Sequence, residues 1–169
     1  KLISKILLKK GDDLRKDHSV MMMFSYFNYL WRTNNVQYKG KFVETLIYKC
    51  VPMSIDFGCL EFIPNCKALR NINYYKSKFG KSEITQLIVS SAASYISSYI
   101  LGIRDRHFDN ILIRNDGTLF NIDFGYFLGE TLSGLDASKF AITNDLKNIM
   151  DNEYNTFLQL CIKSFVILR

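Results

Sequence analysis

Four polar residues near the middle of the chain have the types and spacing of a group that could do chemistry. Asp105 and Asn110 lie five residues apart, and Asp123 follows a short, mostly apolar stretch. Carboxylate and amide oxygens are ligands that Mg²⁺ prefers, and Mg²⁺ keeps part of its coordination shell for phosphate oxygens. His107, between Asp105 and Asn110, can exchange a proton near neutral pH. This set of residues predicts a site of magnesium-dependent phosphoryl transfer.

A β-hairpin is needed to bring these residues together. Asn115-Asp116-Gly117 predicts a tight turn, because Asp-Gly tolerates the positive φ angles that such a turn requires. Strands over 111–114 and 118–122 would then carry Asn110 and Asp123 to neighbouring ends of one ribbon. The interval from Asp105 to Asn110 also equals that between base and metal ligand in the protein-kinase motif H-R-D-x-x-x-x-N, although here the tripeptide reads D-R-H.

The tetrapeptide Ile-Asp-Phe-Gly occurs twice in this chain, at 55–58 and at 122–125. The first copy has no D-R-H-x-x-N upstream and falls where a turn at a strand edge is expected. We therefore interpret the first copy as structural. The second copy, with its companions at the right spacing, is interpreted as part of the active site.

Three motifs resemble those of the phosphatidylinositol 3-/4-kinase superfamily. Its lipid kinases have D-R-H-x-x-N followed by I-D-F-G, as at 105–110 and 122–125 here. Residues 9–17 resemble the family motif K-x-G-D-D-L-R-Q-[DE], and residues 48–63 resemble its tyrosine-bearing strand, turn and hinge. The motifs occur in family order and span nearly the whole chain. The resemblance implies an ATP-dependent lipid kinase that uses Mg²⁺.

The resemblance also implies roles for the residues around the reacting atoms. Asp123 and Asn110 would bind the Mg²⁺ that bridges the nucleotide phosphates. Asp105 and His107 would together orient or deprotonate the attacking lipid hydroxyl, and the sequence does not divide that work between them. Arg106 completes the catalytic loop, more as a brace of the loop than as a contact to the transition state.

Other residues would bind the nucleotide. Lys9 matches the phosphate-binding lysine of the family, with Lys10 as a rival that only the strand register can exclude. Asp17 and Tyr48 resemble a polar pair at the back of the adenine pocket. Hinge backbone and apolar side chains would hold the adenine ring, and these residues are Leu60, Glu61, Phe62, Ile63 and Ile122.

The loop over 126–143 should face the lipid headgroup. Lys139 is its one cation, against Glu130 and Asp136. Recognition of additional phosphates would call for clustered Lys and Arg side chains. We therefore expect plain phosphatidylinositol as the substrate, with Lys139 at the headgroup.

The hydroxyl that receives the phosphate follows less directly from the motifs. The short loop ending at 140–143, the turn at 54–58 and Arg104 resemble phosphatidylinositol 4-kinases. Asp17 and the pair at 101–102 look more like the class III 3-kinase. We expect phosphorylation of the 4-position, with a phosphatidylinositol 3-kinase as the alternative.

Two departures from the family pattern leave other functions open. Only eight residues precede Lys9, where the family has a pair of strands with a phosphate-covering loop, and the chain stops at Arg169, near where family members continue into membrane-contacting C-terminal helices. Lys16 also replaces a glutamine of the first motif, a change that we expect to be tolerated. We expect either a segment of a longer kinase or a strongly reduced one. A protein kinase of the same superfamily and an inactive nucleotide-binding module are further alternatives, and regulatory subunits stay open.

Composition excludes several other classes of protein. The 169 residues are 48% hydrophobic, which suits one globular domain with a real core. The four cysteines form no C-x-x-C pair and only two histidines are present, so we expect reduced thiols and neither zinc nor disulfides. Despite a net charge of +6, the aromatic residues do not alternate with the cations, which argues against nucleic-acid binding. We expect a cytoplasmic protein, peripheral on the cytosolic face of intracellular membranes.

Periodicity predicts an α+β fold. In the first helix, Met22, Tyr26, Tyr29 and Leu30 recur at helical spacing, and Met21–Met23 is interpreted as core filler. Ser82 and Thr143 are expected to cap later helices. The expected strands cover 2–8, 42–51 and 59–63, besides the hairpin, and the expected helices cover 14–31, 83–101, a short stretch after Thr143, and 152–168.

Together with the resemblance, these elements predict a two-lobed, protein-kinase-like fold. Residues 1–63 would form a small, β-rich and apparently truncated N-lobe with the hinge. Residues 64–169 would form a larger, mostly helical C-lobe. The active site would lie in the cleft between the lobes.

Overall fold

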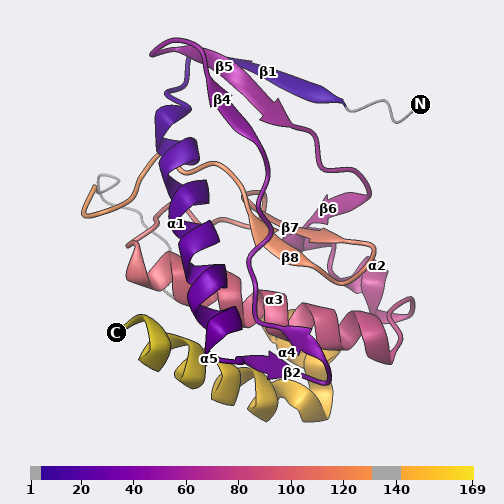
Figure 1. Ribbon diagram of the computed structural model, residues 1–169. Coiled ribbons are helices and arrows are strands. Elements are labelled where there is room, and N and C mark those ends of the chain that lie inside the picture. Colours follow the sequence, from indigo (N-terminus) through magenta and orange to yellow (C-terminus); the bar gives the residue numbers. More distant parts are fainter. Residues whose placement is uncertain (1–4, 131–141) are drawn as a thin grey trace.

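The computed structural model describes residues 5–130 and 142–169, and two three-stranded sheets dominate the arrangement of the site (Figure 1). The upper sheet is antiparallel, with the order β1 (Ile6–Lys10), β5 (Phe57–Glu61), β4 (Cys50–Pro52). The lower sheet has the order β6 (Cys66–Ala68), β7 (Ile111–Arg114), β8 (Leu119–Asn121) and is also antiparallel. The fold is therefore α+β, with small sheets.

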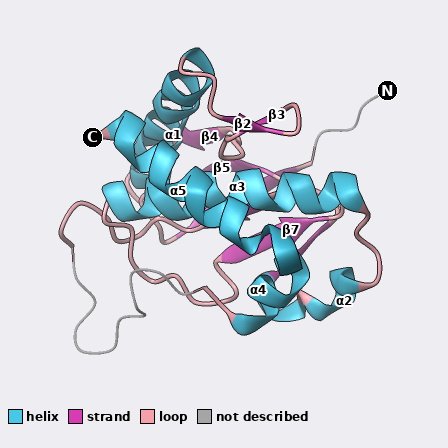
Figure 2. Ribbon diagram, turned by 90° about the horizontal axis from the view of Figure 1, so that it is seen from below, coloured by secondary structure: helices cyan, strands magenta, loops and turns pink. Residues whose placement is uncertain are grey.

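Helices connect and cover these sheets. Helix α1 (Arg15–Thr33) runs from the upper sheet down towards α5 (Tyr154–Leu168), which packs along α3 (Lys81–Ile100) (Figures 1 and 2). The smaller elements are the ribbon β2 (Gln37–Tyr38) and β3 (Lys41–Phe42), the helices α2 (Asn73–Lys76) and α4 (Asn144–Met150), and the 3₁₀ turns Leu69–Asn71 and Asp151–Glu153.

Helix α3 forms the buried centre of the molecule, as its nearly uniform apolar character predicts. Its residues from Leu87 to Ser98 are all buried. Three serines, spaced four residues apart, bind β8, the edge strand of the lower sheet. Leu119 N–H donates to Ser90 Oγ at 2.9 Å, Ser94 Oγ donates to the Leu119 carbonyl at 3.2 Å, and Asn121 Nδ2 donates to Ser98 Oγ at 2.9 Å. These bonds satisfy the free edge of the strand and fix the hairpin against the helix.

The hairpin between β7 and β8 confirms the predicted turn. Gly117 has φ +88°, and a Cβ at this position would lie 2.1 Å from the Glu83 carbonyl oxygen at the start of α3. The turn therefore needs glycine both for its backbone angles and for this close approach. The hairpin thereby has a defined position relative to α3.

The helix caps confirm one prediction and correct another. Thr143 caps α4, because its hydroxyl oxygen accepts the Leu146 N–H at 3.0 Å. The cap predicted at Ser82 is wrong, since α3 begins at Lys81 and Gly80 is the residue before it. Glu83 binds back to the Gly80 N–H at 3.0 Å, so the acidic side chain in the first turn completes the start of the helix.

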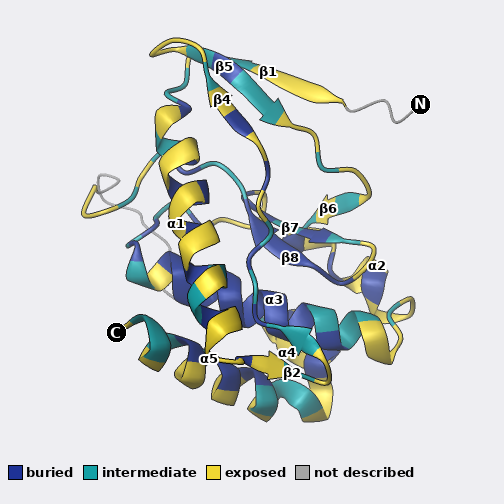
Figure 3. Cartoon of the chain, in the orientation of Figure 1, coloured by how far each residue is buried: buried dark blue, intermediate teal, exposed yellow. Residues whose placement is uncertain are grey.

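The first helix buries a different face from the one that its apolar pattern suggested. Met22, Tyr26 and Tyr29 are each more than half exposed, whereas Val20, Phe24, Phe27 and Trp31 are buried (Figure 3). Of the three consecutive methionines, only Met21 belongs to the core. The helix carries two apolar stripes, and contact with the rest of the chain decides which stripe is covered.

The long strand expected over 42–51 does not form. Residues 43–49 have no regular secondary structure, and only Cys50–Pro52 pairs with β5. Asn28 of α1 takes the place of a neighbouring strand: its side chain accepts the Thr45 N–H and donates to the Thr45 carbonyl, both at 2.8 Å. The backbone groups are thus satisfied by an amide side chain, which pattern reasoning does not detect.

Candidate functional site

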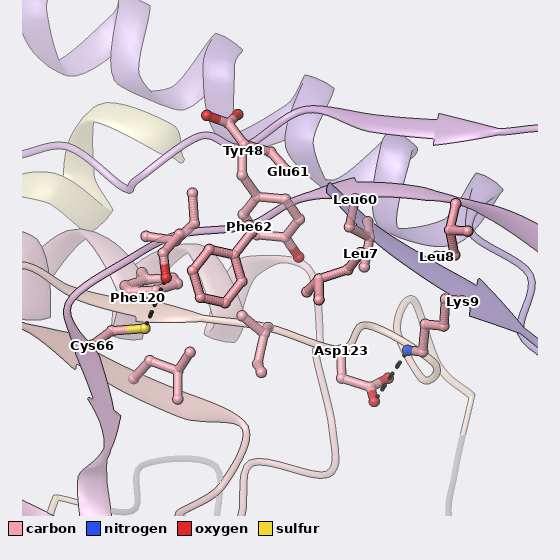
Figure 4. A pocket seen from close by; sticks show the side chains of 13 residues that line it. Leu7, Leu8, Lys9, Tyr48, Leu60, Glu61, Phe62, Cys66, Phe120 and Asp123 are labelled. Carbon is pink, nitrogen blue, oxygen red and sulfur yellow. Dashed lines mark hydrogen bonds and ion pairs between the residues drawn. The ribbon is translucent and has the colours of Figure 1, made fainter. Parts of the chain in front are cut away.

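A cavity of about 420 Å³ lies between the upper and lower sheets (Figure 4). Most of the residues predicted to bind a nucleotide line it, namely Lys9, Tyr48, Leu60, Glu61, Phe62, Ile63 and Ile122. Asp123 stands at the same cavity. The lining is mainly apolar with Lys9 and the Asp123 carboxylate at one end, which suits a flat heteroaromatic ring joined to phosphates (Figure 4).

Five further lining residues were not predicted, and these are Leu7, Leu8, Cys66, Leu112 and Phe120. For one of them, Leu112, the alternation of residues along the strand contained a signal. Ile111 and Ile113 alternate with Leu112 in β7 and are buried in the core, so Leu112 must face the other side of the sheet. The others depend on how the two sheets face each other, which local sequence does not encode.

The strand register distinguishes Lys9 from its rival Lys10. Lys9 lines the cavity, and its Nζ lies 3.4 Å from Asp123 Oδ2 and 2.5 Å from Asp12 Oδ2 (Figure 4). Lys10, the next residue of β1, is exposed and is not among the lining residues. Burial acts to lower the pKa of Lys9, but the hydrogen bond to Asp12 and the charge of Asp123 outweigh it and raise that pKa. The Lys9 amine is therefore protonated and positively charged at neutral pH.

Two other acids of the first motif have different surroundings. Asp13 binds the neighbouring Arg15, at 2.7 Å, and is a local partner of the helix start. Asp17 is almost completely buried, and its Oδ1 has no hydrogen-bond partner within the described residues. Burial raises the pKa of Asp17 to about 6, while the charge of Lys9 acts in the opposite direction. A buried carboxylate oxygen without a partner is costly and is characteristic of functional sites.

Tyr48 is the other member of the predicted polar pair. Its side chain is 4% exposed, yet its hydroxyl end points into the cavity (Figure 4). Burial raises the pKa of Tyr48 well above its usual range, with a smaller contribution from the charge of Asp17. The phenol therefore stays protonated and can donate a hydrogen bond into the cavity.

The backbone at the two key aspartates is unusual. Asp105 has φ 59° and Asp123 has φ 61°, which is the left-handed region that non-glycine residues rarely adopt. Such conformations concentrate at functional sites, where surrounding contacts maintain them. The Ile122 N–H donates to the Asn110 carbonyl at 3.0 Å, so the ends of the hairpin lie together as predicted.

Arg106 holds these two segments together. Its guanidinium donates to the carbonyl oxygens of Arg104 and Ile122, each at 2.9 Å, and to that of Asp123. Burial lowers the pKa of Arg106 to about 10, so the side chain keeps its charge at neutral pH. This geometry is that of a brace between the catalytic loop and the hairpin end.

Asp105 and His107 lie next to each other and are open to solvent. His107 Nε2 is 3.8 Å from Asp105 Oδ1, and both side chains are more than one-third exposed. The Asp109 N–H donates to His107 Nδ1 at 3.2 Å. Because Nδ1 is the acceptor, the neutral ring carries its proton on Nε2, towards Asp105. Asp105 is then the acceptor of the pair, and its Oδ2 also lies 3.5 Å from the Asn110 amide nitrogen.

Asn110 and Asp123 suit Mg²⁺. The Asn110 amide nitrogen donates to the Asp105 carbonyl at 3.0 Å, which leaves the amide oxygen as an acceptor. The Asp123 side chain is 44% exposed. Over residues 5–130 and 142–169, no group of three or more His, Cys, Asp or Glu could hold a metal. Two oxygen ligands are typical of Mg²⁺, which takes its other ligands from water and phosphate.

The side chain of Phe124 is the apolar anchor of the site. It is completely buried, and its ring meets Phe24 of α1 edge to face at a centroid distance of 5.6 Å. The Arg106 guanidinium lies over the same ring, 5.4 Å from the centroid. Lys139, the residue predicted at the lipid headgroup, lies outside the described residues.

Comparison with known proteins agrees with this geometry. The family model of the phosphatidylinositol 3- and 4-kinases matches residues 3–85 and 74–169. A phosphatidylinositol 3-kinase, root isoform, from Glycine max is 40% identical over 141 residues, which cover 74% of this chain and 17% of the relative.

Two further relatives match almost the whole chain. The phosphatidylinositol 3-kinase VPS34 of Candida glabrata is 31% identical over 188 residues, covering 97% of this chain and 20% of the relative. A phosphatidylinositol 4-kinase of Dictyostelium discoideum is 27% identical over 188 residues, covering 97% of this chain and 16% of the relative. The chain thus spans at most a fifth of the length of these relatives.

The helices of the described residues include none that is long and apolar enough to cross a membrane. The motif order, the cavity with Lys9 next to Asp123, and the family match over both parts of the chain lead to one assignment. This chain belongs to the phosphatidylinositol 3- and 4-kinase family.

Proposed function

We propose that this chain transfers the γ-phosphate of ATP to an inositol hydroxyl of phosphatidylinositol in a membrane surface. The observation that carries the proposal is the meeting of Lys9 and Asp123, 3.4 Å apart, at the polar end of the apolar cavity. Lys9 belongs to β1 of the upper sheet, Asp123 follows β8 of the lower sheet, and the two are 114 positions apart in the sequence. Their convergence creates a place where phosphate and metal charges can be balanced.

The nucleotide would occupy the cavity between the sheets. Its adenine ring would lie against Leu60, Ile63 and Ile122, with the backbone of Glu61–Ile63 as the hinge and Tyr48 at the back. Asp17 is not among the residues that line the cavity, but it is buried close enough to Lys9 and Tyr48 for its charge to act on both. Lys9 would contact the phosphates, where a positive charge stabilises the oxygens that gain negative charge during transfer.

Asn110 and Asp123 would hold Mg²⁺, which supplies charge neutralisation at the phosphates when it is bound. Asp105 would accept the proton of the attacking hydroxyl as its oxygen bonds to the γ-phosphorus and the bond to ADP breaks. His107, with its Nε2–H directed at Asp105, would orient that carboxylate. Arg106 would keep the catalytic loop and the hairpin end in register through their carbonyl groups.

The relatives favour the 3-hydroxyl over the 4-hydroxyl that the loop motif suggested. The soybean 3-kinase is 40% identical over its matched part and the yeast 3-kinase 31%, whereas the Dictyostelium 4-kinase is 27% identical. We therefore propose phosphatidylinositol 3-phosphate as the product. The expectation of a 4-kinase rested on short loop motifs, part of which lies outside the described residues.

The proposal includes a two-lobed architecture and a place of action at membranes. A two-lobed kinase-like arrangement, with residues 1–63 as a partial N-lobe and 64–169 as a C-lobe, is supported by the position of the cavity between the upper and lower sheets. Because phosphatidylinositol is a membrane lipid, the protein would act at the cytosolic face of intracellular membranes.

The test is transfer of labelled phosphate from Mg²⁺-ATP to phosphatidylinositol vesicles, with the headgroup isomers separated. We expect the 3-phosphate from the wild type and at least a hundredfold less from Asp105→Asn, which keeps its size but loses its basicity. A 4-phosphate product would overturn the proposed position. Transfer to protein but not to lipid would favour a superfamily protein kinase. If Mg²⁺-ATP raised the melting temperature without any transfer, the chain would be a silent nucleotide-binding module.

A further inference from the structure

Lys16 connects helix α1 to the residues that follow the second Ile-Asp-Phe-Gly copy. Its Nζ donates to the Gly125 carbonyl at 2.8 Å and to both carboxylate oxygens of Glu130, at 2.9 and 2.7 Å. Lys16 and Glu130 are 114 positions apart in the sequence. One side chain therefore joins the first turn of α1 to both ends of the stretch 125–130.

Lys16 and Glu130 form an ion pair at the surface of the molecule. The hydrogen bond from Lys16 holds the pKa of Glu130 below its ordinary value. The two side chains are one-third and nearly one-half exposed, so salt and water weaken the attraction between their charges. The bond to the Gly125 carbonyl adds a charge-assisted contact that does not depend on Glu130.

The residues just before Gly125 are held by other contacts. Arg106 binds the Asp123 carbonyl, and Phe124 is packed against Phe24. Loss of Lys16 would therefore leave the predicted metal ligand Asp123 in place. The effect of Lys16 must fall on the chain after Gly125, which leads from the metal site towards the loop expected at the lipid.

Backbone bonds hold the middle of this stretch against the flank of the catalytic loop. The Arg104 N–H donates to the Tyr126 carbonyl at 3.0 Å, and the Leu128 N–H donates to the Leu101 carbonyl at 2.9 Å. Lys16 acts at the two ends of the stretch, at Gly125 and Glu130. The stretch 125–130 is thus held both by the catalytic loop and by α1.

We propose that Lys16 is a positioning residue for the substrate side of the reaction: it fixes the stretch 125–130 on α1 and so sets where the lipid-facing loop begins. This inference rests on the proposed lipid kinase function. The matching position of the family motif carries glutamine. A glutamine amide could still donate to the Gly125 carbonyl but could form no ion pair with Glu130, so the ionic part of this contact comes from the lysine of this chain.

The first test is kinetic and uses Lys16→Gln and Glu130→Gln. Each variant should lower kcat/KM for phosphatidylinositol about threefold to tenfold, the range for loss of a partly exposed charged contact, and leave KM for ATP within about twofold. Two single reversals, Lys16→Glu and Glu130→Lys, each place like charges together, and combining them in one chain should recover at least half of the loss in kcat/KM of either single reversal, in logarithmic terms. An equal loss for ATP and lipid, or a reversal worse than either single reversal, would overturn the proposal.

A second measurement does not depend on activity. Amide hydrogen exchange of the peptide that covers 124–130, without ATP or lipid, should speed up in Lys16→Gln and stay unchanged in Arg15→Gln. Arg15 is the matched control, since its ion pair with Asp13 is also 2.7 Å long and lies in the same helical turn. Unchanged exchange in Lys16→Gln would refute the contact itself. If the wild type transferred no phosphate while this exchange difference held, the proposed function would fail and the positioning contact would stand.

Discussion

The two copies of Ile-Asp-Phe-Gly have the same four residues in different surroundings. In the first copy, Asp56 lies in the exposed turn between β4 and β5, where the Ser54 hydroxyl donates to its carboxylate at 2.8 Å and its carbonyl accepts the Gly11 N–H. Ile55 is 69% exposed. Every contact of the Asp56 side chain that the structure shows is local to the turn.

In the second copy, Asp123, Phe124 and Gly125 each contact a distant part of the chain. Asp123 meets Lys9 of the upper sheet, and its backbone is left-handed. Phe124 is buried against Phe24. The Gly125 carbonyl accepts a hydrogen bond from Lys16. The comparison shows that this tetrapeptide has no fixed surroundings: one copy lies in an exposed turn, and the long-range partners bring the other to the cavity of the proposed site.

The largest expected difference between the copies is in activity. Asp123→Asn should lower lipid phosphorylation about a thousandfold, because it removes the charge of the proposed metal ligand at the transferring phosphate; this corresponds to about 4 kcal/mol in the barrier. Asp56→Asn, the matched change in the first copy, should leave the rate within about twofold. Initial rates with phosphatidylinositol vesicles measure both. Equal losses in the two variants would mean that the copies have been assigned incorrectly.

Stability should separate the two phenylalanines nearly as strongly. Phe124→Ala removes a fully buried ring and should lower the free energy of unfolding by about 3 to 4 kcal/mol. Phe57→Ala removes a partly exposed ring at the start of β5 and should cost about 1 kcal/mol. Urea denaturation gives both values. The comparison would break if Phe57→Ala proved the more destabilising change.

Asp17, which is buried in α1 and whose charge interacts with that of Asp123 in the second copy, predicts a pH effect, because burial raises the pKa of its carboxyl. The pKa of Asp17 is raised to about 6 from an ordinary value of 3.8, so the folded chain binds this proton more tightly than the unfolded chain does. The corresponding stability is present below about pH 4 and is lost as the pH rises to about 6.

Asp17→Asn removes the ionisable carboxyl and therefore the loss of stability between pH 4 and 6. The variant should be more stable than the wild type at pH 7.5 by up to about 3 kcal/mol, with a flatter dependence of unfolding free energy on pH between 4 and 6. Thermal and urea unfolding across this range measure the effect, with Asp56→Asn as the exposed control. Parallel curves for Asp17→Asn and the wild type would show that the buried carboxylate is compensated in the folded state.

The two glycines, Gly58 and Gly125, should give the smallest difference in stability between the copies. Here the change in the first copy should be the more destabilising one. A Cβ at Gly58 would lie 2.6 Å from the Val51 carbonyl oxygen and 2.8 Å from a Leu14 methyl, so Gly58→Ala should cost about 1 to 3 kcal/mol. A Cβ at Gly125 would meet only Asp123 Oδ1, at 3.9 Å, so Gly125→Ala should change stability by less than about 0.5 kcal/mol. Melting temperatures of the pair are the simplest check. A larger loss in Gly125→Ala would contradict this packing.

Much of the lower half of the molecule could be predicted because its signals are local. The Asn115-Asp116-Gly117 turn, the α3 helix, the Thr143 cap and the approach of Asn110 to Asp123 all follow from a few neighbouring residues. Turn chemistry, helical periodicity and capping act over at most one or two turns of chain, so the sequence displays them directly.

The upper part of the molecule shows where such reasoning fails. Residues 43–49 look like a strand by their apolar content, but Asn28 satisfies the Thr45 backbone from a different element. The methionine and tyrosine stripe of α1 has helical spacing, yet Met22 and Tyr29 face solvent. Both errors arise because the partner of an element, and not its own pattern, determines pairing and burial.

The sequence by itself determined the family, the residue types at the site and the hairpin that brings Asn110 to Asp123, since these depend on motifs and short-range geometry. The tertiary structure alone decided that Lys9 and not Lys10 faces the cavity, that Asp17 is buried without a partner for Oδ1, and that Lys16 reaches Glu130. Each of these facts depends on the distance between side chains far apart in sequence, which the packing of the two sheets and α1 sets.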